Sequence, residues 1–241
     1  MKNSFMALLL FGFVQLNAQK QTAPQSSASN AFNNYETVLN ALNFRGIGPA
    51  VTSGRISDIV VNPLDKSEWY VSAASGGVWK TNNAGTSFLP IFETQASFSI
   101  GCLKMDPKNP HVIWVGTGEG NPRNSMNLGM GIFKSEDSGR TWKHMGLAAT
   151  KTIHRIIIDP RNPNTIYVGA MGDPFKPDSS RGLYKTTDGG QHWKQILFSN
   201  TSSGVADLVM HESNPDKLIV ALYEHHRTPY YFVSGGKGSG I

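Results

Sequence analysis

Short apolar segments recur along the chain in a constant order, and Asn, Asp, Pro or Gly separates them. The first segment of each unit ends in a polar residue, as in residues 59–61 before Asn62 and residues 156–158 before Asp159. A second apolar segment follows, and a third carries an aromatic residue and a lysine, as in Trp79-Lys80. Runs of this length between Pro and Gly are typical of β-strands, and no segment after the first 20 residues has an amphipathic helical period. The pattern therefore predicts an all-β protein.

A turn with the spacing Ser/Thr-x-Asp-x-Gly-x-x-Trp follows the third segment. Two copies are complete, and an earlier copy has Asn83 for the Asp and Phe88 for the Trp. The complete copies contain Ser135, Asp137, Gly139, Trp142, Thr186, Asp188, Gly190 and Trp193. The hydroxyl and the carboxylate can accept hydrogen bonds from the turn's own N–H groups, and the Gly can take the positive φ that closes the turn. We expect the aromatic ring to lie over the next sheet as an apolar anchor.

Four short strands in each repeat of roughly 40–50 residues predict a β-propeller built from four-stranded antiparallel blades. The expected blades cover residues 55–92, 99–147, 153–199 and, incomplete, 204–241. The first strand of each blade is apolar at nearly every position, so we expect it to be the innermost strand, buried on both faces. Gly240 aligns with the glycine that opens the third strand in the earlier repeats. The propeller is therefore expected to be truncated to about three and a half blades.

The amino terminus has the features of a secretory signal peptide. Lys2 supplies a positive charge, residues 5–16 are mostly apolar, and Ala18 is the expected last residue before cleavage. The apolar run is too short to span a membrane. The expected organisation is a signal peptide at 1–18, a flexible lead-in at 19–43 and a partial propeller at 44–241. A secreted, periplasmic or cell-surface location follows from this organisation.

Composition and charge exclude several kinds of site. Cys102 is the only cysteine, so no intramolecular disulfide is possible, and its place in an innermost strand favours a buried apolar role. The formal net charge is +5, but the basic residues are spread along the strands, which argues against nucleic-acid binding. The pair His225-His226 is expected in an exposed loop and has no second cluster at metal-ligand spacing. We expect no metal and no cofactor.

The complete turns resemble the Asp-box, also called the bacterial neuraminidase (BNR) repeat. That repeat occurs in sialidases, in other glycoside hydrolases and in sortilin or Vps10p-type receptors. The wider chain from residue 44 onward, with residues 45–49, 53–55, 74–80 and 116–119, is similar to large secreted bacterial proteins described as sortilin-like or as glycosyl hydrolases. The resemblance implies a propeller whose Asp-boxes lie away from the ligand, so that Asp137 and Asp188 stabilise their turns and are neither catalytic acids nor metal ligands. It does not decide between a receptor and an enzyme.

The repeats differ mainly between their second and third strands, where residues 119–129, 172–181 and 224–239 are extra. These loops open on the face opposite the repeated turns, and insertions gathered on one face typically form the working surface. The candidate ligand-binding residues on that face are Arg55, Glu119, Arg123, Arg155, Glu224 and Arg227. Such carboxylates and guanidinium groups suit carbohydrate or carboxylate ligands. The alternative is that these residues are solvated loop charges.

Two classes of function remain open at this point. The first is a non-catalytic propeller that binds an extracellular protein, peptide or glycan. The second is a glycoside hydrolase that uses paired carboxylates on the long-loop face. A sialidase is less favoured, because Phe44-Arg45-Gly46-Ile47-Gly48-Pro49 places two extra glycines in the sialidase motif Phe/Tyr-Arg-Ile-Pro. No catalytic residue is assigned.

Overall fold

The computed structural model describes residues 54–121, 123 and 126–241. The predicted signal peptide (1–18), the lead-in (19–43) and the motifs within residues 44–53 lie outside the described residues.

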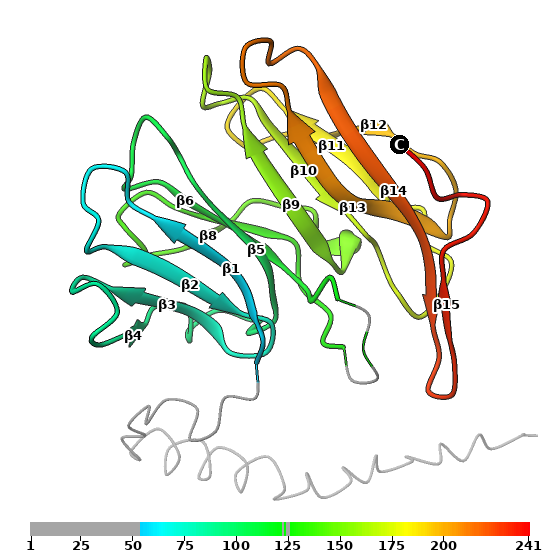
Figure 1. The fold of residues 1–241 in the computed structure, drawn as a ribbon, viewed down its shortest axis with the longest axis horizontal. Coiled ribbons are helices and arrows are strands. Elements are labelled where there is room, and N and C mark those ends of the chain that lie inside the picture. The colour runs from blue at the N-terminus through cyan, green and yellow to red at the C-terminus, as the bar shows by residue number, and fades with distance from the viewer. Residues whose placement is uncertain (1–53, 122, 124–125) are drawn as a thin grey trace, which may run out of the picture. The chain divides into compact units, whose positions relative to one another are not determined.

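Within the described residues, four antiparallel sheets follow one another, with the strands of each sheet in sequence order (Figure 1). The first sheet contains β1 (Ile56–Val61), β2 (Trp69–Ala73), β3 (Gly77–Thr81) and β4 (Leu89–Pro90). The second contains β5 (Ile100–Met105), β6 (Ile113–Thr117), β7 (Ile132–Ser135) and β8 (Lys143–His144), and a short 3₁₀ helix η1 (Ala148–Thr150) follows it. The third contains β9 (Ile153–Ile158), β10 (Ile166–Ala170), β11 (Gly182–Thr186) and β12 (Lys194–Leu197). The fourth contains β13 (Ser203–Met210), β14 (Leu218–Arg227) and β15 (Phe232–Ser234).

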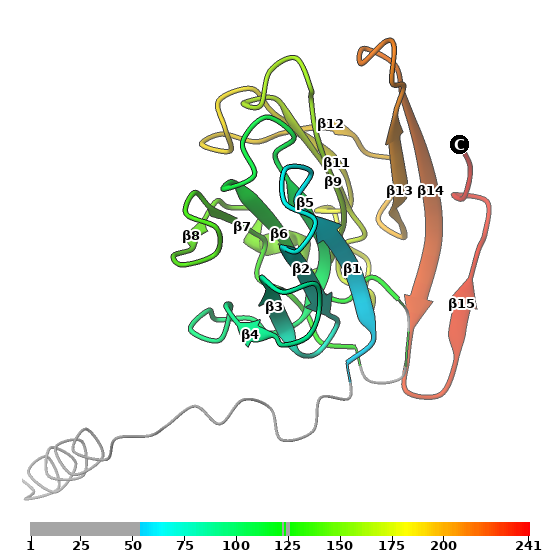
Figure 2. The same ribbon diagram turned by 60° about the vertical axis from the view of Figure 1, so that its left-hand side comes forward.

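The first strands of successive sheets lie side by side around a common centre. Strand β5 is the neighbour of both β1 and β9, and β9 is also the neighbour of β13. Figure 2 shows the sheets fanning outward from these strands, so that β4 and β8 lie on the outside. This arrangement confirms the predicted all-β propeller of four-stranded antiparallel blades.

The apolar core consists of three clusters, one between each pair of successive sheets. Tyr70 and Phe133 belong to the first cluster, Trp114 and Val168 to the second, and Tyr167 and Leu208 to the third. Each cluster excludes water from the facing sides of two blades, and this burial of apolar area holds the blades together.

The expectation that every innermost strand is buried on both faces is wrong for β1 and β13. Strand β5 is almost wholly buried, but Ile56 and Ile59 of β1 are 58% and 52% exposed, and Val209 of β13 is 55% exposed. In the described part of the chain, the first and fourth sheets each pack on one neighbouring sheet, whereas the second and third are covered on both sides. Side chains alternate across a strand, so half of them stay uncovered in a sheet with one neighbour.

The three repeated turns, hereafter the repeat turns, have one geometry. In the second, the Gly139 N–H donates to Ser135 Oγ at 2.8 Å, and the Thr141 N–H donates to Asp137 Oδ1 at 2.8 Å. The glycine has a φ of 84°, which L side chains rarely adopt. Asp188 accepts the N–H of His192 at 3.0 Å in the same way. The predicted hydroxyl, carboxylate and glycine roles are therefore confirmed.

The aromatic residue of each complete turn packs on the preceding sheet, not on the next one as expected. The Trp142 indole N–H donates to the carbonyl of Ile91 at 2.7 Å, and that of Trp193 donates to the carbonyl of Met145 at 2.7 Å. Ile91 and Met145 come directly after the outermost strand of the preceding sheet. Among the described residues, no further strand of that sheet lies beyond this edge to donate a hydrogen bond to their carbonyls. The indole therefore ties each blade to the one before it.

Asp137 organises its turn through the bonds it accepts. Hydrogen bonds from the side chain and backbone of Thr141 lower the pKa of Asp137 to about 2. In Asp137→Ala the Thr141 N–H loses its carboxylate acceptor and must bond to water instead. We therefore expect the free energy of unfolding to fall by about 1 kcal/mol. Denaturant unfolding of the variant measures this loss, with the neighbouring exposed Glu136→Ala as the control. An unchanged midpoint for Asp137→Ala would contradict the structural role.

Residues 224–239, expected as a loop, begin with regular strand structure. Strand β14 continues to Arg227 and pairs with β15, so that His225 lies opposite Ser234. Aromatic and β-branched residues at Phe232 and Val233 favour this pairing over an irregular loop. Leu222 then bridges to Gly240, which is the register that Ala170 and Gly182 have in the third sheet. The hairpin is thus an insertion before the position of the third strand.

Candidate binding site on the loop face

One end of the sheets, hereafter the loop face, carries every long connection between second and third strands. The connection is tight in the first sheet, from Ala73 to Gly77, but long between β6 and β7, between β10 and β11, and after β14. The tip of the β14–β15 hairpin points to the lower side of Figure 1, as does the β6–β7 loop. The repeat turns join third to fourth strands, so the antiparallel order places them at the opposite end.

Arg55 and Glu119 form an ion pair that links the first two sheets at the loop face. Arg55 precedes β1, and its carbonyl accepts the N–H of Ala74 at 2.8 Å. Glu119 follows β6, and its N–H donates to Ser99 Oγ at 3.0 Å. The Glu119 side chain is 3% exposed and the Arg55 side chain 33% exposed. A carboxylate this deeply buried needs a paired cation to offset the loss of its hydration. The exposed third of the Arg55 side chain remains accessible to a ligand.

His154 and Arg123 lie next to this pair. A Cβ atom added at Gly120 would collide with the imidazole of His154, so the backbone after Glu119 lies directly against that ring. Burial, followed by the positive charge of Arg155, lowers the pKa of His154. Burial also lowers the pKa of Arg55, and the charge of Arg123 adds to this effect. The loop face therefore brings together the predicted residues Arg55, Glu119 and Arg123.

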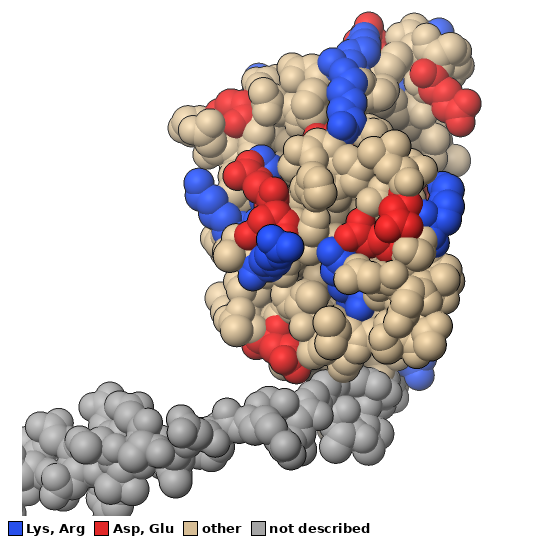
Figure 3. Space-filling model, turned by 90° about the vertical axis from the view of Figure 1, so that its left-hand side faces the viewer, with Lys and Arg blue, Asp and Glu red and all other residues tan. Residues whose placement is uncertain are grey.

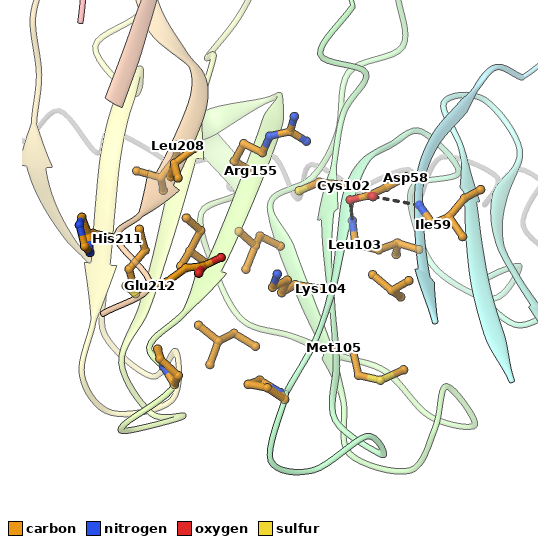
Figure 4. A pocket seen from close by; sticks show the side chains of 18 residues that line it. Asp58, Ile59, Cys102, Leu103, Lys104, Met105, Arg155, Leu208, His211 and Glu212 are labelled. Atoms are coloured by element: carbon orange, nitrogen blue, oxygen red, sulfur yellow. Dashed lines mark hydrogen bonds between the residues drawn. The ribbon is translucent and has the colours of Figure 1, made fainter. Parts of the chain in front are cut away.

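Arg155 lies in the central cavity and is paired. Its Nε donates to Asp207 Oδ1 at 2.6 Å, and both side chains are about half exposed. The cavity of about 590 Å³ is lined by the innermost strands of all four sheets (Figure 4). Figure 4 also shows Asp58, whose carboxylate accepts the N–H groups of Ile59 and Leu103 at 2.9 and 3.0 Å. Asp207 occupies the position in β13 that Arg155 occupies in β9, so the repeat alignment could have revealed this pair.

Glu224 and Arg227 do not join the Arg55–Glu119 site. The Glu224 carboxylate accepts the N–H of Gly238 at 2.8 Å and so closes the segment that follows β15. The Arg227 guanidinium lies 5.5 Å from the ring centre of Phe232, and its backbone N–H donates to the carbonyl of Pro174 at 2.8 Å. Both residues therefore support the β14–β15 hairpin.

The expectation that His225 belongs to an exposed loop is wrong. Its side chain is buried, 1% exposed, and stacks on Tyr223 with ring centres 5.6 Å apart. Arg181 is fully buried beside it, with Nη1 at 3.2 Å from His225 Nδ1 and Nη2 donating to the carbonyl of Asp173 at 2.5 Å. Burial and the charge of Arg181 lower the pKa of His225 to about 4, so the neutral imidazole accepts from the guanidinium. The sequence does not reveal this pair, because its members come from different blades.

The alternative of solvated loop charges fails for the buried residues Glu119, Asp173 and Arg181. Several carboxylates of the loop face and of the central cavity are already engaged. Glu119 and Asp207 pair with arginines, and Asp178 accepts the N–H groups of Asp173 and Ser180. On the side of the molecule seen in Figure 3, acidic and basic residues alternate. The arrangement favours recognition of polar groups over proton transfer.

Two further observations concern the described residues. No three of their His, Cys, Asp and Glu side chains are grouped so as to hold a metal ion. Across the same ranges, the chain forms no helix that is long and apolar enough to cross a membrane.

Comparison with known proteins adds to this geometry. The sequence profile of the family described as Sortilin, neurotensin receptor 3, matches residues 130–238, less than half of the chain. A probable oligoxyloglucan-reducing end-specific xyloglucanase of Neosartorya fischeri is 30% identical over 142 residues, covering 53% of this chain and 15% of that protein. A xyloglucanase of Hypocrea jecorina is 28% identical over 168 residues, 64% of this chain and 18% of that protein.

Solved structures show the same fold. An ancestral GH74 enzyme has a TM-score of 0.56 and 21% identity, covering 74% of this chain and 23% of that one. The GH74 xyloglucanase of Xanthomonas campestris has a TM-score of 0.53 and 15% identity, covering 76% and 30%. The chain spans less than a fifth of the length of the curated relatives it matches. It is therefore a β-propeller that is similar in sequence to xyloglucanases and to the sortilin family.

Proposed function

We propose that the chain is part of an exported glycan-binding propeller, and that its loop face around Arg55 and Glu119 contacts the ligand. The observation that carries this proposal is the Arg55 side chain, which is 33% exposed and is held by a buried Glu119 on the loop face. A fixed guanidinium presents planar hydrogen-bond donors to sugar hydroxyl groups at little cost in conformational entropy. The similarity to xyloglucanases supports a β-glucan such as xyloglucan as the ligand class.

Hydrolysis of such a glucan is the second candidate, and the xyloglucanase relatives favour it. Glycoside hydrolysis requires two carboxyl groups, one of which acts as the acid and the other as the base or nucleophile. Hydrogen bonds from Ser180 lower the pKa of Asp178, and a hydrogen bond from Arg155 lowers that of Asp207. A general acid needs a raised pKa, so these two residues are poorly suited to that role. Binding is therefore the favoured function of the described residues.

Export and the repeat-turn family are part of the same proposal. Lys2, the apolar residues 5–16 and Ala18 support cleavage after residue 18 and a secreted, periplasmic or cell-surface location. The hydrogen-bonding pattern of the repeat turns supports their membership of the Asp-box or BNR class. Amino-terminal sequencing of exported protein that still began at Met1 would contradict the export proposal.

Binding is tested with a glycan and peptide array followed by titration calorimetry. We expect the chain to bind xyloglucan oligosaccharides and Glu119→Gln to weaken binding about tenfold, because Arg55 loses the charge that holds it. Arg123→Ala tests the neighbouring exposed cation, and Lys66→Ala at the far end of the first sheet is the control. Release of sugar that Glu119→Gln abolishes would promote the hydrolase, and peptide binding alone would overturn the glycan proposal.

A further inference from the structure

A second cavity lies on the loop face, beside the Arg55–Glu119 pair and separate from the central cavity. It has a volume of about 310 Å³, large enough for one sugar ring. It is lined by Ser75, Gly76, Gly77, Val78, Trp79, Pro90, Phe92, Glu93 and Phe98. These residues come from the β2–β3 turn, from β3 and β4, and from the connection between β4 and β5. We refer to it as the first-sheet pocket.

Two aromatic rings form the apolar walls of the first-sheet pocket. The Trp79 indole N–H donates to the carbonyl of Gly76 at 2.7 Å, which holds the ring in one orientation. Phe98 is 59% exposed although its backbone is anchored, since its carbonyl accepts the N–H of Gly77 at 2.8 Å. Phe92 is buried, 1% exposed. The exposed phenyl ring of Phe98, on an anchored backbone, offers a stacking surface at little cost in conformational entropy.

Polar groups lie at the edge of the same pocket. Glu93 is exposed and supplies a carboxylate, which can accept hydrogen bonds from two neighbouring hydroxyl groups. Ser75 Oγ accepts from Asn127 Nδ2 at 3.2 Å, and Asn127 belongs to the β6–β7 loop that also carries Glu119. The Ala74 N–H, one residue before Ser75, donates to the carbonyl of Arg55. The pocket is therefore joined to the Arg55–Glu119 site by direct contacts.

We infer that the first-sheet pocket binds one sugar residue of a β-glucan whose neighbouring residues reach Arg55 and Glu119. A glucosyl ring has an apolar C–H face, which matches the walls of Trp79 and Phe98, and a hydroxyl edge, which matches Glu93. A single carboxylate at an otherwise neutral pocket suits a neutral ligand with many donors. This inference rests on the proposed glycan-binding function and adds a specific recognition site to it.

The test titrates xyloglucan oligosaccharides into the chain and its variants by calorimetry. We expect Phe98→Ala to weaken binding about tenfold, the equivalent of about 1.4 kcal/mol for a lost stacking partner. Phe98→Trp keeps a stacking ring and should bind within about threefold of the parent chain. The control is Leu64→Ala, which removes an 83% exposed side chain between β1 and β2, at the other end of the sheet. Saturation-transfer NMR should place the ring protons of one sugar against aromatic protons, and Phe98→Ala should weaken that signal.

The outcomes separate this inference from the proposed function. If the parent chain binds and Glu119→Gln weakens binding, but Phe98→Ala binds like the parent, the first-sheet pocket is not a sugar site and the proposed function stands. If the parent binds no glucan, both are overturned. If Phe98→Ala removes binding of an array peptide and not of a glucan, the pocket recognises peptide and the sugar assignment is wrong. Because Phe98 is exposed, we expect its variants to retain the unfolding temperature of the parent.

Discussion

Lowering the pH from about 6.5 to about 4 is expected to destabilise the folded chain by about 3 kcal/mol through His225 alone. Burial and then the charge of Arg181 lower the pKa of this imidazole to about 4 in the folded state. A hydrogen bond with the Tyr223 backbone opposes this shift, and His226 and His154 lower the pKa slightly further. The unfolded state therefore binds the proton first. Stability is complete above about pH 6.5 and is lost as the pH falls towards the folded pKa.

Unfolding in denaturant between pH 7.5 and pH 4 measures this effect. The variant His225→Asn keeps a neutral polar side chain beside Arg181, so its stability should change much less over this range. His226→Gln is the matched control and should retain the pH dependence of the parent. The carboxylates with lowered pKa values begin to lose their stabilising contribution below about pH 5, and His154 also has a lowered pKa, but these groups are present in the parent and in both variants. The difference in pH dependence between His225→Asn and the parent therefore reports His225. Equal pH dependence in His225→Asn and the parent would refute the assignment to His225.

Replacing the anchors of the repeat turns, in Trp142→Ala or Trp193→Ala, is expected to cost about 2–4 kcal/mol each, somewhat less than a fully buried ring because both side chains are partly buried. Trp142 packs edge-on against Phe92, with ring centres 5.0 Å apart, and donates its indole N–H to the preceding sheet. Its loss opens a cavity between two blades and leaves the Ile91 carbonyl without this donor. The same reasoning applies to Trp193, which packs against the cluster between the second and third sheets.

Two further variants separate packing from hydrogen bonding at these anchors. Trp142→Phe keeps an aromatic ring but loses the indole N–H, so we expect a smaller cost, with about 1 kcal/mol from the hydrogen bond. Phe88→Ala removes the equivalent ring of the first repeat turn, which is 38% exposed, and should cost less than either tryptophan. Equilibrium unfolding compares all four variants. Equal losses in all of them would contradict the anchoring of each blade on its predecessor.

Much of the fold follows from local patterns in the sequence. Residues such as 156–158 form strands because short apolar runs between Pro, Asn and Gly favour extended backbone over helix. Ser135, Asp137 and Gly139 specify their turn because the bonds that stabilise it are made within the turn itself. Such information is local, so the strand order and the blade type could be predicted.

The candidate site could be predicted only in part. The repeat placed Arg55, Glu119 and Arg123 on one face, because strand direction decides at which end of a sheet a loop lies. It did not predict that Arg55 pairs with Glu119, nor that Arg155 pairs with Asp207. It also assigned Glu224 and Arg227 to an open loop, whereas the structure gives them to a strand.

The sequence by itself determined the all-β class, the repeat turns and the face that carries the long connections. Only the tertiary structure decided which charges are buried, which loop-face residues meet, and that Trp79 and Phe98 enclose a pocket. The physical reason is the distance over which each kind of interaction acts. Turn and strand preferences depend on neighbours in the chain, whereas the burial of Arg181 and His225 depends on how two blades stack. That stacking brings together side chains from separate repeats, and no repeat by itself encodes it.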